Sequence, residues 1–362
     1  MSGSEAASKV DISVKVGDVK VIDVVTLGEL LIDFVSTESG VSLIEAPAFQ
    51  KAAGGAPANV AVGLARLGIP SGFVGKVGDD DFGRFLAQTL ARNGVDTSAL
   101  RFSDEARTML AFVSLRADGE REFMFYRHPS ADMLLCPEEI DHAYIGAAKA
   151  LHYGSISLIG EPSRSATLTA VQVALERGLL ISYDPNLRLA LWPSSEAARR
   201  GMLEGWQFAQ VAKVSREELT FLSGESSLEP AVKRLWHDRL RLLVITKGRD
   251  GCHYANRDAR GHVPGFGVQT VDTTGAGDGF VAGLLAGLLS NEGAWESIPD
   301  LENVLRFANA VGALTTTRRG AIPALPTRAQ VVEFLGDNPY RRFGEDRGAP
   351  ATSREPLPEH RP

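Results

Sequence analysis

Short apolar runs alternate with longer amphipathic segments along most of the chain. The runs are almost continuously hydrophobic, as strands buried on both faces are, and the longer segments have the spacing of helices. The pattern predicts strands at 21–27, 71–77, 150–156, 179–184, 210–214 and 241–246. It predicts helices at about 58–67, 80–90, 162–177, 195–206, 216–223 and 229–238. Such alternation favours an α/β fold with helices on both faces of a mostly parallel sheet.

One part of the chain does not fit this alternation. The runs at 108–115 and 120–126 alternate apolar and polar residues, and the Arg-Ala-Asp-Gly between them is typical of a hairpin turn. We expect this hairpin, within residues 107–127, to join residues 31–50 in a small β lid. The lid would lie over the edge of the sheet where ligands bind.

The two ends of the chain differ from the middle. Residues 1–20 mix serines with acidic residues, and the first arginine of the chain is Arg66, so the segment resembles neither a transit peptide nor a secretory signal. Residues 337–362 combine prolines with charged residues and offer little to bury. We therefore expect a disordered leader at 1–20, one domain at 21–336 and a disordered tail at 337–362, in a cytoplasmic protein.

Charge and composition narrow the range of partners. The net charge of −7 does not favour nucleic acid or anionic membranes. The longest apolar run, 280–289, is about half a membrane span. Cys136 and Cys252 are too few and too far apart for a disulfide framework or a zinc site. We expect no nucleic-acid and no membrane partner.

The most informative segment reads Val-Asp-Thr-Thr-Gly-Ala-Gly-Asp-Gly-Phe over 271–280. Gly275, Ala276 and Gly277 precede a helical apolar run, so backbone N–H groups are uncovered at the positive end of the helix dipole. A carboxylate in such an anion site would repel a resting phosphate. We infer that Asp278 takes a proton from an alcohol while the N–H groups hold a phosphoryl group in transfer, as in a small-molecule kinase. The alternative is a helix-capping carboxylate.

A second segment, Gly-Gly-Ala-Pro-Ala-Asn at 54–59, supports this interpretation. Gly54 and Gly55 allow a ligand to approach the backbone closely, and Asn59 offers a donor and an acceptor to sugar hydroxyls. Taken together and in this order, the two segments resemble the paired signatures of the ribokinase-like (PfkB) carbohydrate kinases, and the resemblance covers roughly residues 22–336.

Other motifs are similar to those of plant-type fructokinases within this family, namely Gly-Glu-Leu-Leu-Ile-Asp at 28–33, Tyr-Arg at 126–127, Asp-Pro-Asn-Leu-Arg at 184–188 and Leu-Trp at 191–192. The resemblance implies a three-layer α/β sandwich with a β lid. It implies ATP-dependent phosphorylation of D-fructose at the 6-hydroxyl, which would feed hexose into glycolysis and starch metabolism. It further implies Mg²⁺, with K⁺ as a candidate second cation, and a homodimer through the lid as a candidate assembly.

The resemblance also implies a role for each candidate site residue. The catalytic group comprises Asp278, Gly275, Ala276, Gly277 and Arg188. The sugar-binding group comprises Asp33, Gly54, Gly55, Asn59 and Arg127. The nucleotide-binding group comprises Lys213, Glu218, Thr246, Gly248, Gly251 and Asn309. The cation-binding group comprises Glu218 for Mg²⁺ through water, and Asp272 and Thr274, with the backbone near Arg318 and Gly320, for a monovalent cation. Ser215 departs from the family, which usually has Asn there.

Residue chemistry supports some of these roles and leaves alternatives open. The Arg188 guanidinium can bridge phosphate oxygens or form a surface ion pair. Asp33, which we expect to follow the first strand, lies in an apolar run, where it needs sugar hydroxyls or a structural partner. The segment 246–251 could contact adenine or form a turn between strands. The acceptor could instead be ribose or 2-keto-3-deoxygluconate, and a silent fructokinase-like scaffold is the alternative outside catalysis.

Overall fold

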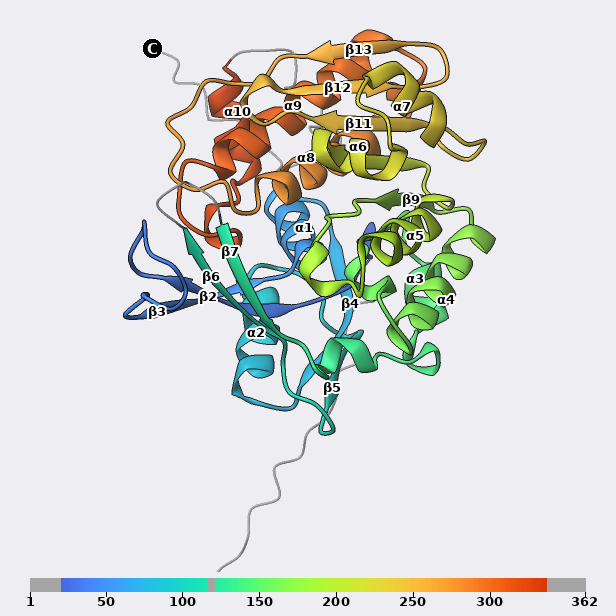
Figure 1. Ribbon diagram of the computed structural model, residues 1–362. Helices are drawn as coiled ribbons and strands as arrows, with labels where there is room; N and C mark the ends of the chain where they lie inside the picture. Colours follow the sequence, from blue (N-terminus) through green and yellow to red (C-terminus); the bar gives the residue numbers. More distant parts are fainter. Residues whose placement is uncertain (1–20, 116–120, 337–362) are drawn as a thin grey trace, which may run out of the picture.

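A large sheet forms the centre of the molecule (Figure 1). The computed structural model describes residues 21–115 and 121–336, so the expected leader and tail lie outside the described residues. Within them the sheet has nine strands in the order β13-β12-β11-β10-β9-β8-β1-β4-β5. The strands are β1 (Val24–Leu27), β4 (Ser71–Gly78), β5 (Leu100–Ser103), β8 (Ala150–Tyr153), β9 (Leu180–Tyr183), β10 (Val211–Ser215), β11 (Leu242–Thr246), β12 (Cys252–Ala255) and β13 (Arg260–Val263). The strands from β11 to β5 are parallel, and only β12 and β13 are antiparallel additions at one edge.

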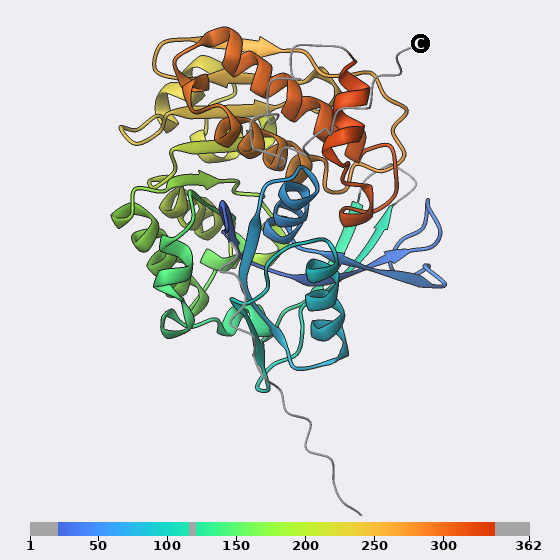
Figure 2. The ribbon, with the colours of Figure 1, turned by 180° about the vertical axis from the view of Figure 1, so that it is seen from behind.

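Helices cover both faces of this sheet, which gives three layers. One face carries α1 (Ala56–Arg66), α2 (Asp81–Arg92), α8 (Ala276–Ser290) and α9 (Ile298–Thr315), with α10 (Arg328–Leu335) packed against α9. The other face carries α3 (His142–Gly146), α4 (Ser163–Glu176), α5 (Ser195–Trp206), α6 (Arg216–Ser223) and α7 (Leu228–Leu235). Figure 2 shows α8 to α10 in orange and red, from behind. The predicted α/β class with a mostly parallel sheet is confirmed.

Three glycines bring α8 and α9 close together. A Cβ atom on Gly279 would lie 2.6 Å from Thr315 Oγ1, one on Gly283 would lie 2.9 Å from Ala308 Cα, and one on Gly287 would lie 2.7 Å from Val304 Cγ1. Because these glycines recur every four residues, they line one side of α8. They let α9 pack against almost bare backbone, and this contact sets the position of the N-terminus of α8.

A separate four-stranded sheet projects to one side of the molecule in Figure 1. Its order is β3-β2-β6-β7, with β2 (Leu31–Ser36), β3 (Phe49–Gly54), β6 (Leu110–Leu115) and β7 (Arg121–Tyr126). The strands fall in and next to the ranges expected for the lid. Aromatic contacts from Phe112 to Phe34, Phe49 and Tyr126 connect all four strands. We refer to this sheet as the small sheet.

Two sequence-based expectations about local structure were only partly right. Asp33 comes after β1 in the chain, as expected, but it lies within β2 of the small sheet and not at the end of a strand of the large sheet, because the chain turns at Gly28, which has a φ of 152°. The strand expected at 150–156 ends at Tyr153, and Ile156–Leu158 form a short 3-10 turn. In both places a glycine follows the last strand residue, and further apolar residues come two or three positions later, so hydrophobicity alone does not mark the boundary.

Candidate active site

At the N-terminus of α8, neighbouring residues lie so close to Gly275 and Gly277 that a larger side chain would not fit. Gly275 caps the helix in the left-handed region with a φ of 77°, and a Cβ there would lie 2.8 Å from the Ala321 Cβ. A Cβ on Gly277 would lie 3.0 Å from the Lys213 Nζ. Asp278 follows in the first helical turn and is 8 % exposed. The first-turn N–H groups and a lysine ammonium thus surround one buried carboxylate, which is an electropositive setting suited to an anion.

Side chains from two distant segments hold the Asp278 carboxylate. Asn59 Nδ2 on α1 donates to Asp278 Oδ2 at 2.7 Å, and Asn186 Nδ2, after β9, lies 3.5 Å from Oδ1. Burial is the main reason that the pKa of Asp278 is raised to about 6. Asp184 acts in the same direction, whereas the Asn59 hydrogen bond, Lys213 and Arg188 limit the rise. Such a carboxylate is ionised at neutral pH and is still basic enough to accept a proton.

Lys213 on β10 forms a buried ion pair with Asp184, with 2.9 Å between Nζ and Oδ2. Burial alone would lower the pKa of Lys213, but Asp184 and Glu218 raise it above the usual value. The ammonium group therefore stays charged beneath the α8 entrance. Lys213 was predicted to bind nucleotide, and the structure brings it next to Gly277.

A tight turn after β9 presents the Asp-Pro-Asn-Leu-Arg segment. Asn186 has a φ of 46°, the only positive φ of a non-glycine residue in the described parts of the chain. Its N–H donates to Asp184 Oδ1 at 3.1 Å. The left-handed conformation costs free energy for a residue with a Cβ, and Asn is among the residues that tolerate it best. This turn points the Asn186 amide toward Asp278, and the segment also carries Arg188, whose charge lowers the pKa of Asp278.

Glu218 fastens this turn to the next strand–helix unit. Its Oε1 accepts from the Leu187 N–H at 2.7 Å and its Oε2 accepts from the Ser215 N–H at 2.7 Å. Ser215 Oγ accepts from the Glu218 N–H in return, which completes a capping box at the start of α6. Ser215 therefore keeps a capping function in place of the Asn that is usual in the family. Each Glu218 oxygen keeps a second lone pair that is able to accept a hydrogen bond from Mg²⁺-bound water. The role of Glu218 toward Mg²⁺ stays a prediction.

Protein groups approach the two glycines of the segment that is predicted to bind sugar. A Cβ on Gly54 would lie 2.1 Å from Asp33 Oδ2, and one on Gly55, which has a φ of 110°, would lie 2.3 Å from the Glu29 carbonyl oxygen. Asp33 is half-buried in β2, directly beside the start of α1. Asn59 Oδ1 is buried and has no hydrogen-bond partner in the described structure, so it is an unused acceptor beside Asp278.

Glu29 is a residue that the sequence analysis missed. It is buried and its Oε1 accepts from the Ala56 N–H at 2.9 Å, so it satisfies one N–H group at the start of α1. Burial raises its pKa to about 7. The motif at 28–33 contained Glu29, but nothing in it indicated a partner. Asp184 and Asn186 belong to the motif at 184–188, but the sequence analysis assigned a role only to Arg188 in it.

Arg127 lies deeper than expected for a lid residue. It is 4 % exposed, its Nε donates to Asp132 Oδ2 at 2.8 Å, and its Nη2 donates to the Ile156 carbonyl oxygen at 3.2 Å. Asp132 also accepts from the Ser130 hydroxyl. The structure thus gives Arg127 a buried ion pair just after β7, and its contact with a sugar stays a prediction.

The residues predicted on the nucleotide side have structural roles of their own. Gly248 and Gly251 have φ values of 57° and 89° in the turn between β11 and β12. Asn309 on α9 donates through Nδ2 to the carbonyl oxygens of Val263 and Pro264 at 3.2 Å each. Thr246, the last residue of β11, leads into this turn. The structure confirms the turn, and the adenine contacts stay a prediction.

The segments predicted to bind a monovalent cation are close together. Asp272 Oδ1 accepts from the Thr274 N–H at 2.9 Å and from its hydroxyl at 2.7 Å. Asp272 Oδ2 accepts from the Gly320 N–H at 2.9 Å. Within the described ranges no cluster of three or more His, Cys, Asp or Glu is placed to hold a metal ion. The cation role of Asp272 and Thr274 stays a prediction.

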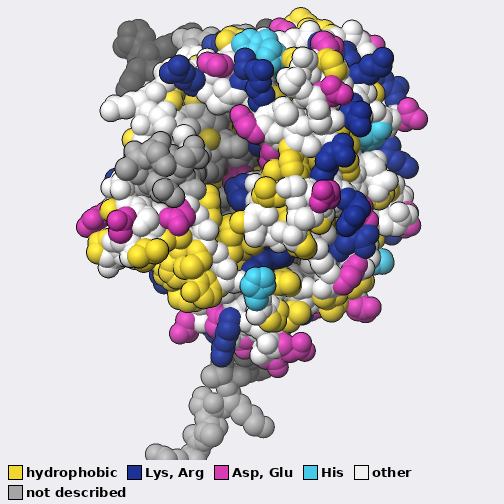
Figure 3. All heavy atoms as spheres, in the orientation of Figure 1, with side chains coloured by type: hydrophobic (Ala, Val, Ile, Leu, Met, Phe, Trp, Pro, Cys, Tyr) yellow, Lys and Arg dark blue, Asp and Glu magenta, His cyan; other side chains and the backbone are white. Residues whose placement is uncertain are grey.

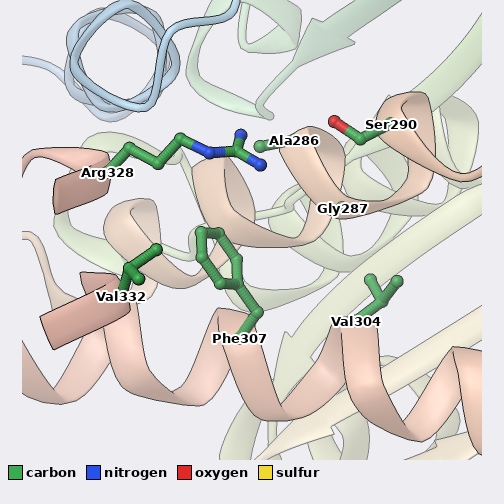
Figure 4. A pocket seen from close by; sticks show the side chains of 7 residues that line it. All are labelled: Ala286, Gly287, Ser290, Val304, Phe307, Arg328 and Val332. Atoms are coloured by element: carbon green, nitrogen blue, oxygen red, sulfur yellow. The ribbon is translucent and has the colours of Figure 1, made fainter. Parts of the chain in front are cut away.

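A small cavity between α8, α9 and α10 is not the substrate site (Figure 4). It has a volume of about 10 Å³, room for about one water molecule. Its lining consists of Ala286, Gly287, Ser290, Val304, Phe307, Arg328 and Val332. In Figure 4 Arg328 and Phe307 extend toward α8 above and below this space. A sugar cannot fit there.

Comparison with known proteins identifies the class of this site. The model of the pfkB family of carbohydrate kinases matches residues 21–328. The chain is 56 % identical over 316 residues to the probable fructokinase-4 of Arabidopsis thaliana, a match that covers 87 % of this chain and 97 % of that protein. The chain therefore belongs to the pfkB family of carbohydrate kinases.

Two crystal structures share the fold over nearly their whole length. A fructokinase from Xylella fastidiosa with bound ATP has a TM-score of 0.79 and 37 % identity, and the match covers 86 % of this chain and 98 % of that one. A double-mutant fructokinase from Vibrio cholerae O395, in a form with fructose, ADP and potassium ion bound, has a TM-score of 0.78 and 36 % identity, covering 88 % and 99 %. The predicted ribokinase-like fold and family are confirmed. No helix in the described part of the chain is long and apolar enough to cross a membrane.

We expect Asp278→Asn to fold and to bind nucleotide normally but to lower kcat by at least about 10²-fold, because the amide cannot accept the proton. Kinase assays and nucleotide titration on one preparation measure both quantities. Asp300→Asn is the matched control, since it removes an acid from the first turn of α9 instead of α8. Turnover within a few-fold of the unmodified protein would show that Asp278 only caps its helix.

The pH dependence should report the pKa of Asp278. Because the base must be ionised, kcat/KM should fall as the pH drops through about 6. Asn59→Ala removes a donor that stabilises the ionised form, so its acidic limb should move to higher pH. Profiles of kcat/KM from about pH 5 to about pH 9, with melting curves at each pH, test this. An unmoved limb in the variant would contradict the role of this hydrogen bond.

Proposed function

We propose that this protein is an ATP-dependent fructokinase that transfers the γ-phosphoryl group to the 6-hydroxyl of D-fructose. The observation that carries the proposal is a buried carboxylate with a pKa of about 6 in the first turn of α8. It is held by Asn59 and lies beside the N–H groups that would receive a phosphoryl group. Fructokinases from plants and bacteria are among its relatives, which supports fructose as the acceptor.

The residues divide the work of transfer. Asp278 accepts the proton of the attacking hydroxyl, and the N–H groups of Ala276, Gly277 and Asp278 stabilise the charge on the transferring group. Lys213, held under Gly277 by Asp184, and Arg188 add positive charge at the same place. Because Asp278 becomes neutral when it takes the proton, its repulsion of the phosphoryl group falls during transfer.

Cations fit two places in this arrangement. Bound Mg²⁺ would neutralise charge on the nucleotide phosphates, and Glu218, whose oxygens each have a free lone pair, would order its water shell. Asp272 and Thr274 would hold K⁺ beside the α8 entrance.

We also propose that the enzyme is located in the cytoplasm.

The sugar would lie between α1 and the small sheet. Asn59 Oδ1 lacks a partner, and Asp33 faces the Gly54 backbone, so both can bind hydroxyl groups. Closure of the small sheet over the sugar would exclude water and suppress ATP hydrolysis. The intact Gly-Ala-Gly-Asp segment favours an active enzyme over a silent scaffold.

A panel of sugars tests the acceptor. Fructose, ribose and 2-keto-3-deoxygluconate are each incubated with ATP, and the position of phosphorylation is assigned by NMR. Fructose should have the highest kcat/KM and give fructose 6-phosphate. If ribose or 2-keto-3-deoxygluconate reacted faster, the acceptor assignment would be wrong, and if none reacted, the scaffold interpretation would be right.

Asp33→Ala should weaken fructose binding by about tenfold to two-hundredfold, since loss of a charged hydrogen-bond partner costs about 1.5–3 kcal/mol. ATP affinity and the melting temperature should stay nearly unchanged. Asp33→Asn is the matched variant, because it keeps the shape beside Gly54 while it removes the charge. A large drop in melting temperature with unaltered fructose affinity would show that Asp33 is a structural acid.

The small sheet also presents a surface for a second copy of this chain. Met124 and Tyr126 are 42 % and 57 % exposed, and they extend the aromatic group of Phe49 and Phe112 on one face of the sheet. Figure 3 shows hydrophobic side chains gathered over this region, at the lower left. Such an exposed apolar patch on one face of a sheet suits a self-complementary interface, so we propose a homodimer through it.

Met124→Glu should convert a dimer into a monomer, because two glutamates would face each other in an apolar interface. Light scattering after gel filtration gives the mass. Phe102→Glu is the control, since Phe102 is 45 % exposed but lies on β5 at the far edge of the large sheet. A dimer that survives Met124→Glu, or a monomeric unmodified protein, would refute the interface.

A further inference from the structure

A groove with a volume of about 290 Å³ opens at the antiparallel edge of the large sheet, between α7 and strands β12 and β13. Leu228, Val232, Ile245 and Ala255 form its apolar floor. This face of β12 points away from α8, because Cys252 and Tyr254 pack toward α8 and α9 while Ala255 packs with the opposite core. The groove is therefore on the opposite side of the sheet from Asp278.

Two histidines form the polar wall of the groove. His253 on β12 pairs with His262 on β13, and their ring centroids are 4.8 Å apart. His262 Nε2 is 2.9 Å from the Asp250 carbonyl oxygen, which lies in the turn between β11 and β12. Arg260 is at the rim, where its Nε is 3.3 Å from Glu229 Oε2 in a largely exposed pair.

Several cationic groups act on His253. Burial lowers the pKa of His253, and the charges of His262, Lys247 and Arg216 lower it further. The groove is also lined by the acidic Glu229, whose carboxylate forms an ion pair with Arg260. A groove with cationic groups and imidazole N–H donors above an apolar floor is complementary to a small anion that has a less polar body.

We propose that this groove binds a phosphorylated small molecule and thereby changes nucleotide affinity through the turn between β11 and β12. The phosphate group would bind to His253, His262 and Arg260, and the body of the molecule would cover the apolar floor. The same turn that contains Thr246 and Gly248 contacts the groove, because the Asp250 carbonyl oxygen is 2.9 Å from His262 Nε2 and the charge of Lys247 acts on His253. This effect on nucleotide affinity rests on the proposed role of the turn in ATP binding, whereas binding of the anion does not.

Binding is tested directly, with the active site filled by a non-hydrolysable ATP analogue and fructose. Inorganic phosphate, glycerol 3-phosphate, fructose 6-phosphate and neutral glycerol are titrated while the histidine ring signals are followed by NMR. The anions should shift the His253 and His262 signals, phosphomonoesters at lower concentration than inorganic phosphate, and glycerol should shift neither. If no anion shifts these signals, the site does not exist.

Variants separate the groove from other anion sites. His253→Gln and Arg260→Ala should each weaken anion binding by about tenfold or more, while kcat without added anion stays unchanged. His142→Gln, at the exposed start of α3, is the control. If the variants bind anions as tightly as the control, the groove is not the site.

The regulatory part has its own readout. The KM for ATP, measured with and without the tightest phosphomonoester, should change at least twofold in the unmodified protein and in His142→Gln, but not in His253→Gln. Direct titration of ATP shows independently whether the chain binds the nucleotide. Anion binding with an unchanged KM for ATP would overturn the coupling, and loss of ATP binding altogether would instead contradict the proposed kinase function.

Discussion

The hydrogen bond between Asn59 and Asp278 joins two residues that are 219 positions apart, and the geometry of the site depends on it. The packing of α1 against α8 sets the length of this hydrogen bond. A Cβ on Gly63 of α1 would lie 2.6 Å from the Ala282 Cβ of α8, so the two helices are in close contact. One signature segment lies at the N-terminus of α1 and the other at the N-terminus of α8. Because these two helices are packed together, the segments converge on the Asp278 carboxylate. The precision of the site therefore comes from the core as much as from the motifs.

Burial of acidic groups at this point is costly, and the surrounding residues compensate for it in different ways. The Asp184 carboxylate forms an ion pair with Lys213, and the Glu218 carboxylate accepts hydrogen bonds from two backbone N–H groups. Asp278 receives only partial compensation, from Asn59 and the helix entrance, so its pKa stays near 6. Of Asp184, Glu218 and Asp278, Asp278 has the least complete compensation, and an incompletely compensated buried acid that can exchange a proton is a common feature of catalytic sites.

The sequence predicted the layers, most of the parallel strands and the helix entrance at Asp278, because periodicity and small residues are local signals. It did not predict that Arg127 would be buried with Asp132, that Glu29 would hold the start of α1, or that Asn186 would approach the base. These contacts join segments through the packing of distant elements, and no local pattern encodes them. The antiparallel strands β12 and β13 were missed because their sequences, Cys-His-Tyr-Ala and Arg-Gly-His-Val, contain no continuous apolar run.

A glycine in the sequence can indicate correctly that the backbone must lack a side chain, without indicating which group requires this. Gly54 and Gly55 were interpreted as places where a ligand approaches the backbone, and the structure brings Asp33 and the Glu29 carbonyl there. Both interpretations require the absence of a Cβ, so the residue type alone cannot distinguish a ligand from a neighbouring protein group. The same holds for Gly248 and Gly251, whose positive φ values are needed for the turn after β11.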